Sequence, residues 1–171
     1  MNIPIIKTEM QKSFLDKLRS RSANVQKDVT AAVSKIIENV RENGDKALLE
    51  YTEKFDNIKL DCLEVKKDEI LSAYKRSSIT SQLERAAENI KAYHKNQLRK
   101  GFEIKKENGT VIGQKIRPLS RVGIYVPGGT AAYPSSVLMN ALPAKVAGVD
   151  EIIMVTPPQK NDDILAAAYI A

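Results

Sequence analysis

The sequence has few of the side chains on which most catalytic and metal sites depend. It contains 171 residues with one cysteine, one histidine and no tryptophan. Because a disulfide needs two cysteines, Cys62 can form none within the chain, which favours a cytoplasmic protein. His94 has no second histidine with which to bind zinc, and the acidic residues show no ligand-like spacing. No Ser/His/Asp or Cys/His arrangement can be assembled either, so these residues predict neither a catalytic nor a metal-binding side chain.

Long apolar runs are also absent, and charge of one sign does not cluster. No run reaches the length of a membrane span, and the N-terminal residues lack the basic and apolar segments of a signal peptide. The net charge is +6, but basic residues are interspersed with acidic ones and aromatic residues make up only 5% of the chain. Solvated helix faces explain this pattern better than a nucleic-acid surface does. We therefore expect no membrane and no nucleic-acid partner.

Apolar residues recur at helical spacing through the first hundred residues. The pattern predicts a short helix over residues 8–20 and a longer one over 24–43, which Gly44 ends. After a third helix, an apolar run predicts a short strand within 58–65. Cys62 would be a small buried side chain in that strand.

Further helices and a hairpin complete this first part of the chain. Ser81 and Glu84 have the spacing of a capping box, and the helix that they begin carries His94 on its apolar stripe. A lone histidine in such a position is usually structural. Asn108-Gly109 then joins two alternating runs. This dipeptide predicts a β-hairpin with a tight primed turn, because both residue types tolerate positive φ.

The stretch after residue 120 has the pattern of a strand, a glycine loop, a helix and a second strand. Residues 122–126 predict a buried strand that breaks at Pro127-Gly128-Gly129, and residues 152–155 predict the second strand. A strand, a helix and a strand in this order form the unit of a parallel α/β sheet.

Ligands of parallel sheets bind beyond the carboxyl ends of the strands, which places the expected site between Tyr125 and Ser136. The glycine loop there is neither the G-x-G-x-x-G fingerprint of dinucleotide-binding proteins nor a Walker A loop. The residue types alone leave both ligand binding and a plain tight turn open. Ser135 and Ser136 are of the type that caps the following helix.

Together these patterns predict an α/β protein, in which an N-terminal helical region with a β-hairpin precedes the start of a parallel α/β domain. We expect an N-terminal helical segment over 1–22, an incomplete helical α/β scaffold domain over 23–120, and the first part of the α/β domain over 121–171. The final residues, DDILAAAYIA, predict a helix. Two β-α units are too few to close a parallel sheet, so the chain is expected to stop in mid-domain.

One long motif resembles a known family. The stretch YVPGGTAAYPSSVLMNALPAKVAGV, residues 125–149, is similar to histidinol dehydrogenases. The resemblance extends more loosely to RENGDKALLEYTEKFD at 41–56 and NIKAYHKNQ at 89–97, and so covers almost the whole chain. It implies a Rossmann-like, NAD-binding domain of the aldehyde/histidinol dehydrogenase kind. Members of this family are zinc-dependent homodimeric oxidoreductases that oxidise L-histidinol to L-histidine through L-histidinaldehyde, the last steps of histidine biosynthesis.

The resemblance also implies a cofactor site. The family uses the tyrosine of this motif to contact NAD, so Tyr125 is expected to do so, with Pro127, Gly128, Gly129 and Thr130 beside the cofactor. The zinc ligands and a glutamate–histidine acid/base pair of the family lie outside this chain, which is therefore expected to be inactive alone. The alternative is a stand-alone nucleotide-binding or regulatory module without catalysis.

Overall fold

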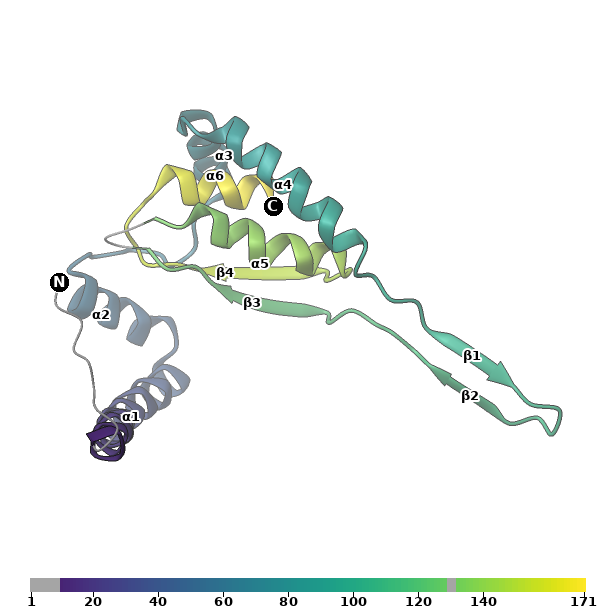
Figure 1. Cartoon of the computed structure of the whole chain (residues 1–171). Helices are drawn as coiled ribbons and strands as arrows, with labels where there is room; N and C mark the ends of the chain where they lie inside the picture. The colour runs from purple at the N-terminus through teal and green to yellow at the C-terminus, as the bar shows by residue number, and fades with distance from the viewer. Residues whose placement is uncertain (1–9, 129–131) are drawn as a thin grey trace. The chain divides into compact units, whose positions relative to one another are not determined.

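The structure is a computed structural model that describes residues 10–128 and 132–171 (Figure 1). In this part of the chain the elements follow one another in the order α1, α2, α3, α4, β1, β2, β3, α5, β4, α6. This mixture of helices with a parallel strand pair is the predicted α/β class. No described helix combines the length and the apolar character that a membrane crossing requires.

The first of two compact units, Met1–Asp61, contains the helices α1 (Gln11–Asn43) and α2 (Asp45–Asp56). The prediction of two separate helices in place of α1 was wrong. The sequence of α1 has neither glycine nor proline, so nothing interrupts its i→i−4 hydrogen bonds. Gly44 ends α1 as predicted, with a φ of 55° and its N–H donated to Val40 O at 2.8 Å. The domain limits expected from the sequence stay a prediction.

The second unit, Cys62–Ala171, follows an irregular segment where the sequence predicted a strand within 58–65. That prediction was wrong. A strand is stable only when its backbone groups pair with a neighbour, and this segment pairs with no described strand. Asn57, at the end of α2, has a left-handed φ of 55°. Cys62 is exposed rather than buried, because no sheet forms around it.

Two helices open this unit, α3 (Lys67–Arg76) and α4 (Thr80–Lys95). The predicted capping box of α4 does not form, because the helix already includes Ser81 and its N-cap has no side-chain hydrogen bond. Glu84 instead accepts a hydrogen bond from the Tyr74 hydroxyl of α3 at 2.5 Å. The Glu84 carboxylate thus links α3 to α4 and does not cap the start of α4.

The predicted hairpin is present as β1 (Phe102–Lys105) paired antiparallel with β2 (Val111–Gln114). Its turn differs from the prediction, since Gly109 has a positive φ of 82° and its partner in the dipeptide does not. Lys106 N–H donates to Thr110 O at 2.8 Å, which closes a loop of three residues. Such a loop needs one left-handed residue, and glycine supplies it. Both strands are exposed throughout.

The predicted strand–helix–strand unit is confirmed. The two strands pair in parallel along their whole length, from Arg121 opposite Glu151 to Tyr125 opposite Val155. A parallel pair needs a long crossover, and a helix provides it here. The elements of this part are β3 (Arg121–Tyr125), α5 (Pro134–Val146), β4 (Glu151–Val155) and α6 (Asp162–Ile170).

Helix α5 begins in a different way from the prediction. Its N-cap residue is Tyr133, which makes no side-chain capping bond, and Pro134 is the first helical residue. Proline is favoured there because its missing N–H would have no partner within the helix. Ser135 and Ser136 therefore lie inside the first turn and do not cap the helix.

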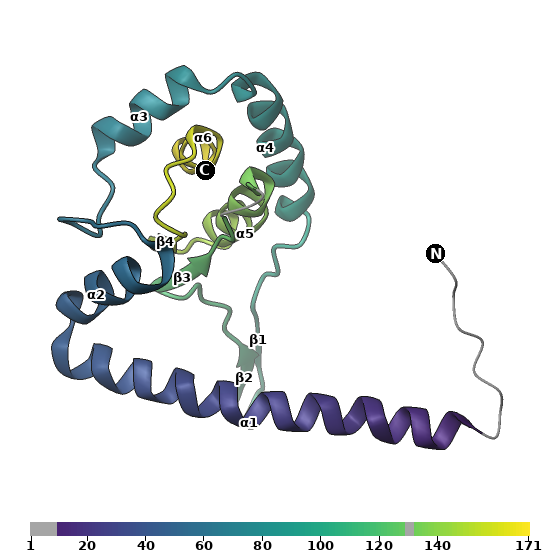
Figure 2. The same cartoon turned by 90° about the vertical axis from the view of Figure 1, so that its left-hand side faces the viewer.

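The core of the second unit lies between one face of the β3–β4 pair and the helices α4, α5 and α6, which lie on the same side of it (Figures 1 and 2). Leu138 and Leu142 of α5 and Val126 after β3 are each 0% exposed. Ile124 is half-buried but its neighbour Tyr125 is exposed, so the prediction of a fully buried strand was wrong for one face. The buried cluster comprises Leu83, Ala87, Val126, Val137, Leu138, Leu142, Ile164, Ala166 and Ala167.

We predict that Leu138→Ala lowers the free energy of unfolding by about 2–5 kcal/mol, because it leaves a cavity in this core. The change is measured by urea denaturation followed by circular dichroism. Met139→Ala is the matched control, since the neighbouring Met139 side chain is 54% exposed and Leu138 is fully buried. An equal loss in the two variants would contradict the position assigned to this core.

Candidate functional site

Strands β3 and β4 end at the same edge of the sheet, where Tyr125 lies opposite Val155. Val126 extends the pairing by one residue, since its N–H donates to Val155 O at 2.9 Å. The chain leaves β3 through residues 126–128, residues 132–133 precede α5, and a loop of residues 156–161 joins β4 to α6. Carboxyl ends of parallel strands are where ligands of such sheets bind, so these two loops form the candidate site.

Tyr125 is the most exposed of the predicted site residues that the structure describes, at 65%. Successive side chains of a strand point to opposite faces. Because Ile124 is half-buried on the helix-covered face, the Tyr125 ring lies on the open face. Ile153 and Val155 of β4 occupy the same open face and are 44% and 57% exposed. The site thus combines an apolar surface with a phenol group.

Pro127 and Gly128 follow the strand and are half-buried. A Cβ atom added to Gly128 would lie 3.4 Å from Pro157 Cδ and 3.5 Å from Thr156 Oγ1, so the two loops are in contact. These are ordinary van der Waals distances, so the start of the loop after β4 lies directly beside the backbone of Gly128. The other two predicted residues, Gly129 and Thr130, lie outside the described residues.

Thr156 is a polar residue of the site that the sequence analysis missed. Its hydroxyl oxygen is buried and has no hydrogen-bond partner in the described part of the chain. Its position in the sequence, directly after an apolar strand and before Pro157-Pro158, could have indicated a site residue. Buried polar groups are nearly always paired, so an unpaired hydroxyl beside Gly128 suits a site that accepts a ligand.

The start of α5 brings the Ser135 N–H to this edge, since Pro134 has no N–H and the Ser136 N–H donates to Tyr133 O at 3.0 Å. The N-cap residue, Tyr133, leaves the first turn without a side-chain cap. Backbone N–H groups at a helix N-terminus, together with the helix dipole, favour an anion such as a phosphate. The uncapped helix, the Thr156 hydroxyl and the exposed Tyr125 ring are groups that fit a nucleotide.

A zinc ion does not fit the described residues. In residues 10–128 and 132–171 no three His, Cys, Asp or Glu side chains come together as a metal-binding group. His94 is half-buried on α4, with its Nδ1 2.6 Å from Gln97 Oε1 and its ring edge-on to Tyr93. This environment is that of a structural histidine, in keeping with the sequence analysis.

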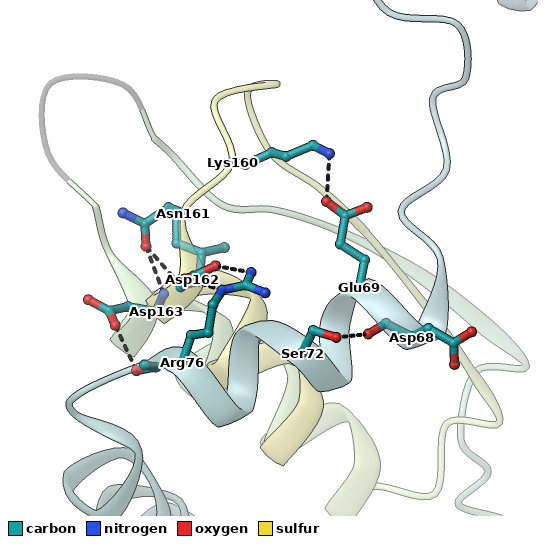
Figure 3. A network of polar contacts seen from close by, with 10 residues as sticks. Asp68, Glu69, Ser72, Arg76, Lys160, Asn161, Asp162 and Asp163 are labelled. Carbon is teal, nitrogen blue, oxygen red and sulfur yellow. Dashed lines mark hydrogen bonds and ion pairs between the residues drawn. The ribbon is translucent and has the colours of Figure 1, made fainter.

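Charged side chains join α3 to the start of α6 (Figure 3). Arg76 donates two hydrogen bonds to the Asp162 carboxylate, at 2.6 and 2.9 Å. The hydrogen bond from Arg76 holds the pKa of Asp162 below its ordinary value, and the same contact raises the pKa of Arg76. Nearby, the hydrogen bond to Glu84 raises the pKa of the Tyr74 phenol.

Comparison with known proteins identifies the family. The family model for histidinol dehydrogenase matches residues 19–171. The chain belongs to the histidinol dehydrogenase family. The resemblance found in the YVPGGTAAYPSSVLMNALPAKVAGV motif is thereby confirmed, and with it the α/β fold class.

Individual histidinol dehydrogenases support the same conclusion. The chain is 51% identical over 164 residues to the histidinol dehydrogenase of Clostridium acetobutylicum, an alignment that covers 92% of this chain and 38% of that protein. It is 53% identical over 148 residues to that of Streptococcus mutans, covering 84% and 35%. The crystal structure of histidinol dehydrogenase from Elizabethkingia anophelis aligns with a TM-score of 0.76 and 35% identity, covering 84% of this chain and 35% of that one. The chain thus spans less than two-fifths of the length of these three relatives.

We predict that Asp162 makes the stability of this chain depend on pH. Its folded-state pKa is depressed, so its contribution is present above the unfolded pKa of about 3.9 and is lost as the pH falls through the folded value. The difference in urea midpoint between the wild type and Asp162→Asn should therefore shrink when the pH falls from about 6 to about 2.5. Arg76→Gln should remove the same pH-dependent part. A midpoint difference that does not change with pH would contradict the assignment.

Proposed function

We propose that the chain is part of a histidinol dehydrogenase that oxidises L-histidinol to L-histidine through L-histidinaldehyde, with NAD as the oxidant, in the last steps of histidine biosynthesis. The observation that carries this proposal is the family match over residues 19–171, with relatives 44% to 53% identical that bear this name. A cytoplasmic location and a homodimeric full-length protein belong to the same proposal.

The role proposed for this chain is to bind and orient NAD. When bound, NAD accepts the hydride that leaves the substrate. Tyr125 offers an exposed ring against which a base or the nicotinamide can stack, and the Ser135 N–H at the start of α5 can face the pyrophosphate. The other proposed neighbours of the cofactor are Pro127, Gly128, Gly129 and Thr130.

The zinc and acid/base residues are proposed to belong to the part of the relatives that this chain does not cover. Each oxidation step needs a base that takes a proton from an alcohol or an aldehyde hydrate. The described residues offer no group of side chains that could bind zinc. The alternative, a stand-alone nucleotide-binding module, shares the NAD site but differs in having no catalytic role.

We predict that the purified chain with L-histidinol, NAD and zinc produces no NADH, because the acid/base pair and the zinc ligands are proposed to lie in the part of the relatives that it does not cover. The formation of NADH is followed by absorbance. A full-length histidinol dehydrogenase such as that of Clostridium acetobutylicum is the positive control. Turnover by the isolated chain would disprove the proposal that these groups lie elsewhere.

We predict that Tyr125→Ala weakens NAD binding through the loss of ring stacking, which is worth roughly 1–3 kcal/mol, or about 5- to 150-fold in Kd. The Kd is measured by isothermal titration calorimetry of the 171-residue chain. Tyr93→Ala is the matched control, because Tyr93 is also 65% exposed but belongs to α4 and to neither of the segments that follow β3 and β4.

Two results would count against the cofactor site. Equal affinity in the Tyr125→Ala and wild-type chains would remove Tyr125 from it. A wild-type chain that binds no NAD would overturn the proposal that this part of the protein binds the cofactor by itself.

A further inference from the structure

The loop between β4 and α6, residues 156–161, forms one wall of the candidate cofactor site. Its first two residues are those that a Cβ atom on Gly128 would meet, at 3.5 Å for Thr156 Oγ1 and 3.4 Å for Pro157 Cδ. The pairing of β4 with β3, which Val126 continues, fixes where this loop begins. The contacts at the other end of the loop, where it enters α6, determine how rigidly the loop is held beside Gly128.

The other end is attached to α3 by polar side chains, which Figure 3 shows converging on the start of α6. Lys160 Nζ lies 2.7 Å from Glu69 Oε1, and the Arg76 guanidinium binds both oxygens of Asp162. We call these residues the α3–α6 clamp. A further bond from the Ser77 hydroxyl to Asp163 Oδ1, 2.7 Å long, completes it.

The first turn of α6 is organised by the same segment. Asn161 Oδ1 accepts hydrogen bonds from the N–H groups of Asp163 at 3.0 Å and Ile164 at 3.1 Å, so it caps the helix. The loop thus ends in a residue whose backbone and side chain are both fixed. Its neighbours on either side, Lys160 and Asp162, each hold a partner on α3.

We propose that Arg76 and Asp162 are positioning residues for the cofactor site, which act through the loop 156–161 to hold Thr156 and Pro157 against Gly128. This inference rests on the proposed NAD-binding function. In this proposal both residues act through the loop and not by direct contact with the cofactor. The clamp fixes the position of α6 along α3, and the position of α6 fixes the conformation of the loop that leads into it.

The character of the clamp supports this role over a purely stabilising one. The Arg76 and Asp162 side chains are 55% and 39% exposed, and an ion pair at such exposure contributes only a small, pH-dependent part of the stability. Apolar contacts, such as that between the Tyr74 and Tyr169 rings at 4.5 Å, already hold α3 and α6 together. A bidentate arginine–carboxylate pair fixes the relative orientation of the two groups. Such a contact suits a loop that must keep one conformation beside a ligand.

The test compares two exposed ion pairs in the 171-residue chain. Arg76→Gln breaks the clamp. Arg121→Gln is the matched control, because the Arg121–Glu151 pair has similar exposure, 64% and 50%, but joins the amino ends of β3 and β4, away from the loop. The readouts are the Kd for NAD by calorimetry, amide hydrogen exchange in residues 159–165, where the N–H groups of Asp163 and Ile164 are bonded to Asn161, and the melting temperature.

For Arg76→Gln we expect faster exchange in 159–165 and a Kd about two- to fivefold higher, while Arg121→Gln changes neither. The charge reversal Arg76→Asp with Asp162→Arg should restore both values toward wild type, which a nonspecific loss of stability would not do. Asp162→Asn provides a second way to break the pair if Arg76→Gln fails to fold.

Exchange and Kd values that are the same in the Arg76→Gln and Arg121→Gln chains would overturn the positioning role. If the wild-type chain binds no NAD, the proposed function fails. In that case the exchange rates alone decide whether the clamp holds the loop. Failure of the inference and failure of the function are therefore separate results.

Discussion

The second unit depends on the burial of one face of a two-stranded parallel sheet. A pair of parallel strands is not stable alone in water, and its neighbours must cover it. Leu138 and Leu142 of α5 do this from the crossover between the strands, and they are fully buried with Val126. Helices α4 and α6 close the cluster around them. Because this packing fixes both strands, it also brings the two loops of the candidate site to one edge.

The sequence predicted the parts of the fold whose signal is local and periodic. The strand–helix–strand unit carries apolar runs of strand length on either side of a helical pattern, and the structure has all three elements. Predictions failed where the outcome depends on partners. The run within 58–65 resembles a strand but has no neighbour to pair with. The predictions of a two-residue turn at Gly109 and of a capping box at the start of α4 were also wrong. In both cases the neighbouring strands or helices, rather than the residue types, decide the local structure.

The candidate site was predictable in the same uneven way. Tyr125 and Gly128 could be placed at the strand ends because position in a parallel sheet follows from the order of elements. The contact of Gly128 with Thr156 could not be predicted, because it joins two loops that are separated by a whole helix. The α3–α6 clamp was equally hidden, since no local pattern relates Arg76 to Asp162. The family could be predicted from the long motif at residues 125–149. The periodicity of apolar residues indicates the fold class but does not identify a family.

The distance along the chain between the clamp partners has a consequence for synthesis on the ribosome. Arg76 and Asp162 are 86 residues apart, so α3 is made long before α6. At a rate of about 5–20 residues per second, this separation corresponds to roughly 4–17 seconds. Throughout that interval Ala73 and Tyr74, which pack in the finished unit, lack the helix that covers them. The contact between α3 and α6 therefore forms late in synthesis, only after α6 has left the ribosome.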